Sequence, residues 1–576
     1  MNPMSWTPDD TTMNLIRHMA IQNAIEYEGK ANPGSVIGRI MGMNADLRPH
    51  GKTISPMIAK AVVEANMMAG SKGIEHLKNI LQDEAPHLLE ERQKKERRVG
   101  LPELPNAEKG KVVLRFAPNP NGPLSFGHAR GIVINGSYAE KFDGELILRF
   151  DDTDTSVKPP LLEAYQQIPE EAEWLLGFAP HRIVIASDRM EHYYEHAEMM
   201  LSRGFGYVCM CSAESFRELR VAKSECPCRN QESGFNMELW NKMLDGTFKP
   251  GDAVVRVKTG MDLKNPALRD WPALRMQDTE TNPHPRKEIG SKYRVWPLLD
   301  FQSAVEDHLQ GVTHIIRGDD HLNNAARQMT IYNAMGWDVP VWAHIPLIFG
   351  GDGKKLSKRH GATGAEEYQV MGYPAAGMRN YLTRLGWSHG DDEFFTDAQA
   401  KEWFDLKGIG KSPARFDFKK LESLCGQHIA QTDDAALVKQ ITAFLNASDR
   451  PVLSDAQSNG LLNGMYCLKE RAKTFPDLLE KAIFVLSKRP IVPDEKAAKN
   501  LDSVSHGILS ELTPLLSTVS WDRDSLEAAL NAFCEAKGTK FGKLAGPLRA
   551  ALAGRAVTPS VFDMMLVLGQ EESLAR

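Results

Sequence analysis

The spacing of hydrophobic and polar positions divides the chain into three regions. Residues 1–100 have the periodicity of helices, and Thr7-Pro8-Asp9-Asp10 is typical of a helix start, with a hydroxyl N-cap, proline at the first helical position and acids in the first turn. Ser55-Pro56 repeats this signal. The Pro-rich segment LPELPNAEKGK follows and is typical of a linker. We therefore expect a helical N-terminal domain at 1–100.

The second region has the pattern of alternating strands and helices. Short apolar runs rich in β-branched residues predict strands at 111–116, 145–150, 182–187 and 313–318. A Gly/Pro/Asn turn and a helical stretch from His128 to about Phe142 separate the first two runs. This strand–turn–helix–strand order predicts parallel strands with a right-handed crossover. The expected fold class is therefore α/β, with a doubly wound, Rossmann-like parallel sheet.

The last third of the chain lacks strand signals. From about Phe394 helical periodicity dominates, which predicts an all-α region. The total of 576 residues is too long for one hydrophobic core and suggests three to five domains. After the N-terminal domain, the expected divisions are the first half of the sheet, an insertion, the second half of the sheet and the helical region, at 111–190, 191–290, 291–390 and 391–576.

Composition excludes some classes of protein. No 18-residue apolar run is present, and the N-terminus MNPMSWTPDD lacks a basic segment followed by an apolar one. We therefore expect no membrane span, no secretory signal and a cytoplasmic location. The net charge of −6 does not exclude RNA binding, because phosphate contacts need only a local basic face.

A first motif, RFAPNPNGPLSFGHARG at 115–131, links the first strand to the helix that follows. The unpaired N–H groups and the positive end of the dipole at a helix N-terminus favour an anion there. Gly127 permits close approach of a ligand, and His128 can donate to a phosphate oxygen. Neither a P-loop nor a GxGxxG fingerprint is present. Taken alone, the Gly-His pair is better explained by a structural histidine.

A second motif, GGDGKKLSKRHGA at 350–362, is a Gly-rich basic loop. Lys355, Ser357, Lys358 and Arg359 cluster within it and suit the binding of a polyphosphate as charge develops during a reaction. The alternative is a solvated basic turn.

Together the two motifs resemble the paired signatures of class I aminoacyl-tRNA synthetases. Gly127-His128 is similar to the second half of the His-Ile-Gly-His motif, and KLSKR at 355–359 to the Lys-Met-Ser-Lys-Ser motif. Four segments narrow the resemblance to glutamyl-tRNA synthetases: RFAPNPNG at 115–122, RFDDTD at 149–154, GVTHIIRG at 311–318 and GKKLSKRHGA at 353–362. The resemblance implies that the insertion binds the tRNA acceptor end and that 391–576 bind the anticodon.

The resemblance also implies a reaction and its residues. Glutamate attacks the α-phosphate of ATP, and the glutamyl group of the adenylate then passes to the terminal ribose of tRNA(Glu). ATP, bound with Mg²⁺, would contact Ser125, Gly127, His128, Lys355, Ser357 and Lys358, of which His128, Lys355 and Lys358 are the catalytic candidates. Glutamate would contact Arg115, Asn119, Asp151 and Arg317. Surface ion pairs are the alternative for these charged residues. The family commonly has His where this chain has Ser125, whose hydroxyl can donate one hydrogen bond but carries no charge.

Four cysteines form two closely spaced pairs, Cys209-x-Cys211 and Cys226-x-Cys228. In a cytosolic chain this CxC–x14–CxC spacing favours a tetrahedral, structural Zn²⁺ site over disulfides. Four buried free thiols are the alternative. A related zinc knuckle occurs in some members of the family that the chain resembles.

The resemblance is of two kinds along the chain. Residues 1 to about 310 resemble the archaeal type of glutamyl-tRNA synthetase, and residues from about 311 the bacterial type, with a junction near GVTHIIRG. We therefore keep the hypothesis of a chimera, which is either an active synthetase or a tRNA-binding chain with weak or no turnover. A glutaminyl-tRNA synthetase and a smaller nucleotidylyltransferase are two rival interpretations of the same motifs. The expected partners are L-glutamate and tRNA(Glu), with tRNA(Gln) left open, and a monomer is expected.

Overall fold

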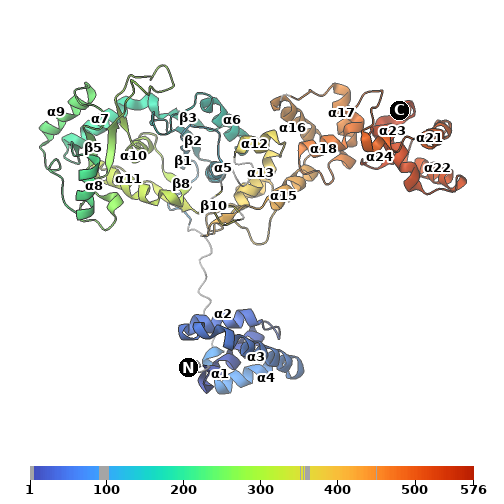
Figure 1. Cartoon of the computed structure of the whole chain (residues 1–576), viewed down its shortest axis with the longest axis horizontal. Coiled ribbons are helices and arrows are strands. Elements are labelled where there is room, and N and C mark those ends of the chain that lie inside the picture. Colours follow the sequence, from blue (N-terminus) through green and yellow to red (C-terminus); the bar gives the residue numbers. More distant parts are fainter. Residues whose placement is uncertain are drawn as a thin grey trace, which may run out of the picture. The chain divides into compact units, whose positions relative to one another are not determined.

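The computed structural model describes residues 6–89, 103–350, 352–354, 356, 364–410, 412–448 and 450–576. The chain separates into two compact units, Met1–Arg98 and Val99–Arg576 (Figure 1). Within the first unit the helices pack around an apolar core that includes Ile16, Ile54 and Leu77. Its helices are α1 (Asp10–Glu26), α2 (Pro33–Met43), α3 (Gly51–Lys72) and α4 (Ile74–Glu84).

Two helix starts in this unit differ from the sequence signals. The N-cap of α1 is Asp9 rather than Thr7, because the Asp9 carboxylate accepts the N–H of Thr12 at 2.8 Å. α3 begins at Gly51, before the predicted start at Ser55, so that Pro56 lies inside the helix.

The second unit contains the predicted parallel sheet. β1 (Val113–Phe116), β2 (Glu145–Phe150) and β3 (Arg182–Ile185) pair in parallel, as do β8 (His314–Gly318) and β9 (Val341–Ile345). Thr313 joins the two sets, because its N–H donates to the Val113 carbonyl at 3.0 Å and its hydroxyl accepts the Val113 N–H at 2.9 Å. The α5 (Phe126–Lys141) and α6 (Ala164–Leu176) helices connect the first strands. The doubly wound fold is therefore confirmed.

An antiparallel sheet with its own core forms the inserted part. β4 (Gly206–Cys209), β5 (Val254–Val257), β6 (Pro272–Met276) and β7 (Val295–Pro297) pair in this order. The core includes Trp240, Val255 and Trp296. Helix α7 (Met190–Ser202) precedes this sheet, and α8 (Ala213–Ala222) and α9 (Ser233–Leu244) lie between β4 and β5. Helix α10 (Leu299–Leu309) returns the chain to the parallel sheet, where α11 (Leu322–Met335) connects β8 to β9.

The chain after the parallel sheet is helical among the described residues, apart from one strand. That strand, β11 (Ala414–Arg415), pairs in parallel with β10 (Ile348–Phe349). The helices are α12 (Ala365–Val370), α13 (Ala375–Arg384), α14 (Asp397–Trp403), α15 (Phe418–Gln431), α16 (Asp434–Ala447), α17 (Asp455–Leu468), α18 (Phe475–Lys481), α19 (Ile483–Leu486), α20 (Glu495–Ala498), α21 (Ser503–Leu516), α22 (Arg523–Ala536), α23 (Phe541–Ala553) and α24 (Val561–Ala575). Among the described residues, no helix combines the length and apolarity that crossing a membrane requires.

Candidate active site

A cavity of about 270 Å³ lies at the carboxyl ends of the parallel strands. In an open α/β sheet this edge is where ligands bind, because the loops that leave the strands diverge there. The wall is built from the end of β1, the start of α5, the end of β8 and the connection between β9 and β10. The cavity brings together six of the predicted site residues: Arg115, Ser125, Gly127, His128, Asp151 and Arg317.

A buried network of charges forms one side of this cavity. Asp307 on α10 accepts hydrogen bonds from Arg115 Nε at 3.1 Å and from Arg149 Nη1 at 2.6 Å. Arg149 in turn donates from Nε to Asp151 at 2.7 Å, and the Gln302 amide donates to the same Asp151 oxygen at 2.7 Å. Both Asp307 and Arg149 are almost completely buried. Arg115, β2 and α10 are thereby fixed to one another by paired charges.

The protonation of the two acids follows from this network. Burial opposes ionisation of Asp307, but the guanidinium groups of Arg115 and Arg149 outweigh it and hold the pKa of Asp307 below its usual range. Asp151 has a raised pKa, because burial outweighs the attraction of Arg149 and Arg115. The network therefore places the ionised carboxylate of Asp307 behind the cavity. The carboxyl group of Asp151 lies in the cavity wall, and a bound cation would favour its ionised form.

Arg317 at the end of β8 has a guanidinium N–H group that makes no hydrogen bond among the described residues. Its Nε lies 3.5 Å from His344 Nε2, and its buried Nη2 has no hydrogen-bond partner in the part of the chain that the structure describes. Burial and the nearby charge of Arg115 lower the pKa of Arg317 to about 10. Burial and the charge of Arg317 lower the pKa of His344 to about 4, so this histidine is neutral at pH 7 and adds no second positive charge beside Arg317. The arrangement suits an incoming carboxylate.

Asn119 lies apart from the other predicted site residues. Its amide nitrogen donates to the carbonyl of Lys158 at 3.2 Å, and it is not one of the residues that line the cavity. The first turn therefore uses Asn119 to contact the loop after β2.

The first motif places a helix N-terminus at the cavity. Ser125 is the N-cap of α5, and its hydroxyl oxygen accepts the N–H of His128 at 3.2 Å. His128 is exposed on the first turn. An added Cβ at Gly127 would meet only the Ser125 hydroxyl, at 3.8 Å, so the absent side chain leaves space on the cavity side. The start of α5 can thus approach an anion closely.

The second motif is described only in part. Lys355, Ser357 and Lys358 lie outside the described residues. Leu347 and Ile348, which precede the motif, line the same cavity as His128. Gly364, which follows it, forms an antiparallel bridge with Ser125. Both flanks of the second motif therefore adjoin the first motif.

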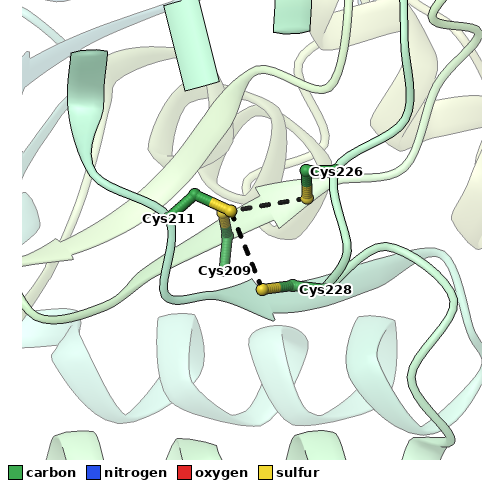
Figure 2. Close-up of side chains that lie close together, drawn as sticks. All are labelled: Cys209, Cys211, Cys226 and Cys228. Atoms are coloured by element: carbon green, nitrogen blue, oxygen red, sulfur yellow. Dashed lines mark hydrogen bonds between the residues drawn. The ribbon is translucent and has the colours of Figure 1, made fainter. Parts of the chain in front are cut away.

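The four clustered cysteines converge in the inserted part (Figure 2). Cys209 ends β4 and Cys211 follows it, whereas Cys226 and Cys228 lie in the turn between α8 and α9. Cys209 and Cys226 sulfurs are 4.0 Å apart, those of Cys211 and Cys228 are 3.9 Å apart, and all four lie within 4.8 Å of one another. Burial and the neighbouring thiols raise the pKa of Cys211 to about 11.

Two residues of the charge network were not predicted from the sequence. Arg149 stands inside the apolar run ELILRF, and Asp307 lies on α10, 192 residues after Arg115. A charged residue within a predicted buried strand is a signal that a partner exists, because an unpaired buried charge is costly. The sequence does not reveal which residue is the partner.

Comparisons with known protein families cover most of the second unit. Residues 111–423 match the model for the catalytic domain of class I tRNA synthetases for E and Q, and residues 435–576 match an anticodon-binding domain. A glutamate–tRNA ligase 2 of Ruegeria pomeroyi is 55% identical over 475 residues, 81% of this chain and 97% of that protein. The chain belongs to the glutamyl-tRNA synthetases. Another relative, glutamate–tRNA ligase 2 of Roseobacter denitrificans, is 54% identical over 81% of this chain and 98% of its own length.

A solved structure agrees with this assignment. The glutamate–tRNA ligase of Elizabethkingia meningosepticum, crystallised in complex with its amino acid, has a TM-score of 0.61 at 25% identity. The match covers 81% of this synthetase and 98% of that chain.

The relatives also bear on the predicted junction near residue 310. One relative aligns over 81% of this synthetase, which is far more than the part that follows residue 310. The same relative therefore matches sequence on both sides of that position. The two kinds of resemblance do not require two parent genes for this part of the chain. Neither family model reaches residues 1–110.

We predict that replacing Asp307 by Ala lowers the free energy of unfolding by about 3–5 kcal/mol, because Arg115 and Arg149 lose their common partner while they remain buried. Urea denaturation followed by tryptophan fluorescence measures the change. Glu108→Ala is the control, since it breaks only an exposed pair with Lys111 and should leave the transition unchanged. Equal midpoints for the two variants would contradict the prediction.

Proposed function

We propose that this synthetase attaches L-glutamate to tRNA(Glu) in two steps, through a glutamyl-adenylate, with release of pyrophosphate and then AMP. The observation that carries the proposal is a single cavity with the N-terminus of α5 on one side and, on the other, the Arg317 guanidinium, whose Nη2 has no hydrogen-bond partner among the described residues. One feature suits a carboxylate and the other a phosphate. Neither step requires a protein nucleophile, so positioning and charge stabilisation account for catalysis.

Glutamate is proposed to lie between Arg317 and Asp151. Arg317 has a free buried N–H group for a carboxylate, whereas Asp151 offers a carboxylate to the amine. A bound ammonium group would favour the ionised form of Asp151 and so offset the effect of burial on its pKa. Arg115 contributes positive charge from its position beside Asp307. Asn119 joins the contact only if its side chain leaves the Lys158 carbonyl.

ATP is proposed to lie along the start of α5, with Mg²⁺ bound to its phosphates. Gly127 allows the nucleotide to approach, and His128 and the Ser125 hydroxyl are donors at the same edge. Lys355, Ser357 and Lys358 are proposed to complete the binding of the phosphates. Because the Ser125 oxygen already accepts a backbone N–H, its contribution to ATP is its hydroxyl proton.

Two substitutions separate the proposed roles. Lys358→Ala should lower the rate of glutamate-dependent ATP–pyrophosphate exchange by about 100- to 1000-fold, as loss of one transition-state donor does, without changing the Kd for glutamate. Arg317→Gln should instead raise the Kd for glutamate by about 10- to 100-fold, because a charged hydrogen bond is lost. An ATP–pyrophosphate exchange assay measures the exchange rate, and calorimetric titration with glutamate measures the Kd.

Arg317→Lys is the matched control, since it keeps the charge but removes the planar pair of donors. An intermediate Kd is expected. Equal losses in exchange and glutamate binding for Lys358→Ala would contradict its role in the transition state.

The four-cysteine cluster is proposed to bind a structural Zn²⁺. Zn–S distances of about 2.3 Å in a tetrahedral site place the sulfurs about 3.8 Å apart, close to the separations between Cys209 and Cys226 and between Cys211 and Cys228. Burial and the neighbouring sulfurs raise the pKa of Cys211, and a bound divalent cation would offset that effect by favouring the thiolate. Four protein ligands leave no open position, so the metal would join β4 to the turn before α9.

We predict one equivalent of zinc in the purified protein, measured by inductively coupled plasma mass spectrometry. Cys211→Ser should lose most of the metal, because a serine hydroxyl is a poor Zn²⁺ ligand at neutral pH. Cys467→Ser is the control, since Cys467 lies in α17 outside the cluster, and it should keep the full equivalent. Wild-type protein free of zinc would exclude the site.

The experiment that tests the function is aminoacylation of purified tRNA(Glu) and tRNA(Gln) with radiolabelled glutamate and glutamine. Charging of tRNA(Glu) with glutamate alone is the expected result, since the guanidinium groups of Arg115 and Arg317 match an acidic side chain. Glutaminylation of tRNA(Gln) would favour the less supported alternative. Because one chain provides the complete cavity wall, we also propose that the enzyme acts as a monomer, in the cytoplasm where ATP and tRNA are available.

A further inference from the structure

Two buried charged residues beside the cavity have no part in the contacts proposed above. Arg130 lies on the first turns of α5, and Glu171 lies on α6. Each is only 2% exposed. Among the described residues neither forms a salt bridge, although an unpaired buried charge is costly. Each donates to or accepts from a backbone group next to one of the two motifs.

Arg130 reaches the segment that enters the second motif. Its Nη1 donates to the carbonyl of Pro346, which lies between β9 and β10 and lines the cavity together with Leu347. Its Nε is buried and has no hydrogen-bond partner among the residues that the structure describes. Burial lowers the pKa of Arg130 to about 10, so the side chain still carries its charge at pH 7. The guanidinium therefore fixes α5 to the entry of the second motif.

The surroundings of Arg130 are shaped to admit it. Gly386 has a φ of +90°, and an added Cβ there would lie 2.9 Å from Arg130 Nη2. A side chain at residue 386 would therefore both strain the backbone and displace the guanidinium. The space for Arg130 is provided by a residue that follows α13, far from both motifs in the sequence.

Glu171 reaches the turn of the first motif that leads into α5. Its Oε2 accepts the N–H of Leu124 at 2.8 Å, while its buried Oε1 has no hydrogen-bond partner within the described residues. Burial, together with the charge of Glu366, raises the pKa of Glu171 to about 7. Ionised or protonated, the carboxyl group keeps an oxygen that accepts from Leu124.

Leu124 also connects the first motif to the residues that directly follow the second motif. Its carbonyl accepts the N–H of Ala365 at 2.9 Å, and the next residue, Ser125, bridges to Gly364. Gln167, one turn before Glu171 on α6, donates to the carboxylate of Glu366 at 2.5 Å. The exit of the second motif is thus hydrogen-bonded to the start of α5, and α6 supports both.

We propose that Arg130 and Glu171 are positioning residues that hold the entry and the exit of the second motif at fixed places along α5. The spacing between the first motif and the described flanks of the second is then set by two buried side chains that hydrogen-bond to backbone groups, although Arg130 also lines the cavity. The inference rests on the proposed function, because it assigns the spacing to the ATP side of the cavity. Arg115 and Arg317 lie on β1 and β8, so glutamate binding does not depend on these two hydrogen bonds.

Four variants test this role in ATP–pyrophosphate exchange. Arg130→Met and Glu171→Leu remove the hydrogen bonds and should raise the KM for ATP and lower kcat, with a combined loss in kcat/KM of about 100-fold, as a displacement of about 1 Å causes. The KM for glutamate should change less than twofold. Arg130→Lys, which keeps a donor, and Glu171→Gln, which keeps an acceptor oxygen, should recover most of the activity.

Two exposed residues provide matched controls. Glu173→Leu makes the same change two residues further along α6, and Arg203→Met makes the same change at the end of α7. Both should match the wild-type kinetics. Hydrogen exchange of peptides covering 120–126 and 344–350 should be faster in the Glu171→Leu and Arg130→Met proteins, respectively, than in these controls.

The outcomes separate this inference from the proposed function. Wild-type protein without exchange activity would reject the proposed function itself. Active wild type with unchanged Arg130→Met and Glu171→Leu kinetics would overturn the positioning role, as would equal increases in the KM values for ATP and glutamate. If either variant fails to fold, the milder Arg130→Gln and Glu171→Ala proteins are measured instead. A rise in the KM for ATP without a rise in the KM for glutamate supports the positioning role, and unchanged or equally raised KM values overturn it.

Discussion

The carboxylate of Asp307 is the interaction on which the catalytic part of this synthetase depends. It pairs with guanidinium groups from β1 and β2, so a helix that follows the insertion is joined to the two strands that precede it. Water is excluded there, and each charge is tolerated only because the others are present. The same network orients Arg115 and Asp151 in the cavity wall, so the stability of the sheet and the geometry of the site have a common origin.

Local patterns predicted much of this fold. The β-branched runs gave the parallel strands, and their carboxyl ends gave the position of the cavity, because every open parallel sheet has its ligand edge there. The spacing of Cys209, Cys211, Cys226 and Cys228 likewise predicted that the sulfurs converge. These successes rest on periodicity and spacing, which are properties of short segments.

The remaining features depend on tertiary pairing. Asn119 was expected at the ligand, but its amide contacts the Lys158 carbonyl, a choice that only the folded loop after β2 could decide. The roles of Asp307 and Glu171 are equally hidden in the sequence, where an acid on an amphipathic helix resembles any surface acid. Their burial depends on which helix face meets the sheet. Lys355, Ser357 and Lys358 stay predictions from the resemblance of their motif.

The hydrogen bonds between Val113 and Thr313 have a consequence for how the chain folds. They close a loop of 200 residues, and the entropy of closing such a loop must be met before its contacts stabilise anything. The inserted part lies inside that loop and has a hydrophobic core of its own. If this part folds early, less flexible chain remains between β1 and β8, and the loop costs less entropy to close. On this view the insertion serves the catalytic sheet during biosynthesis, as a compact spacer, before it meets any substrate.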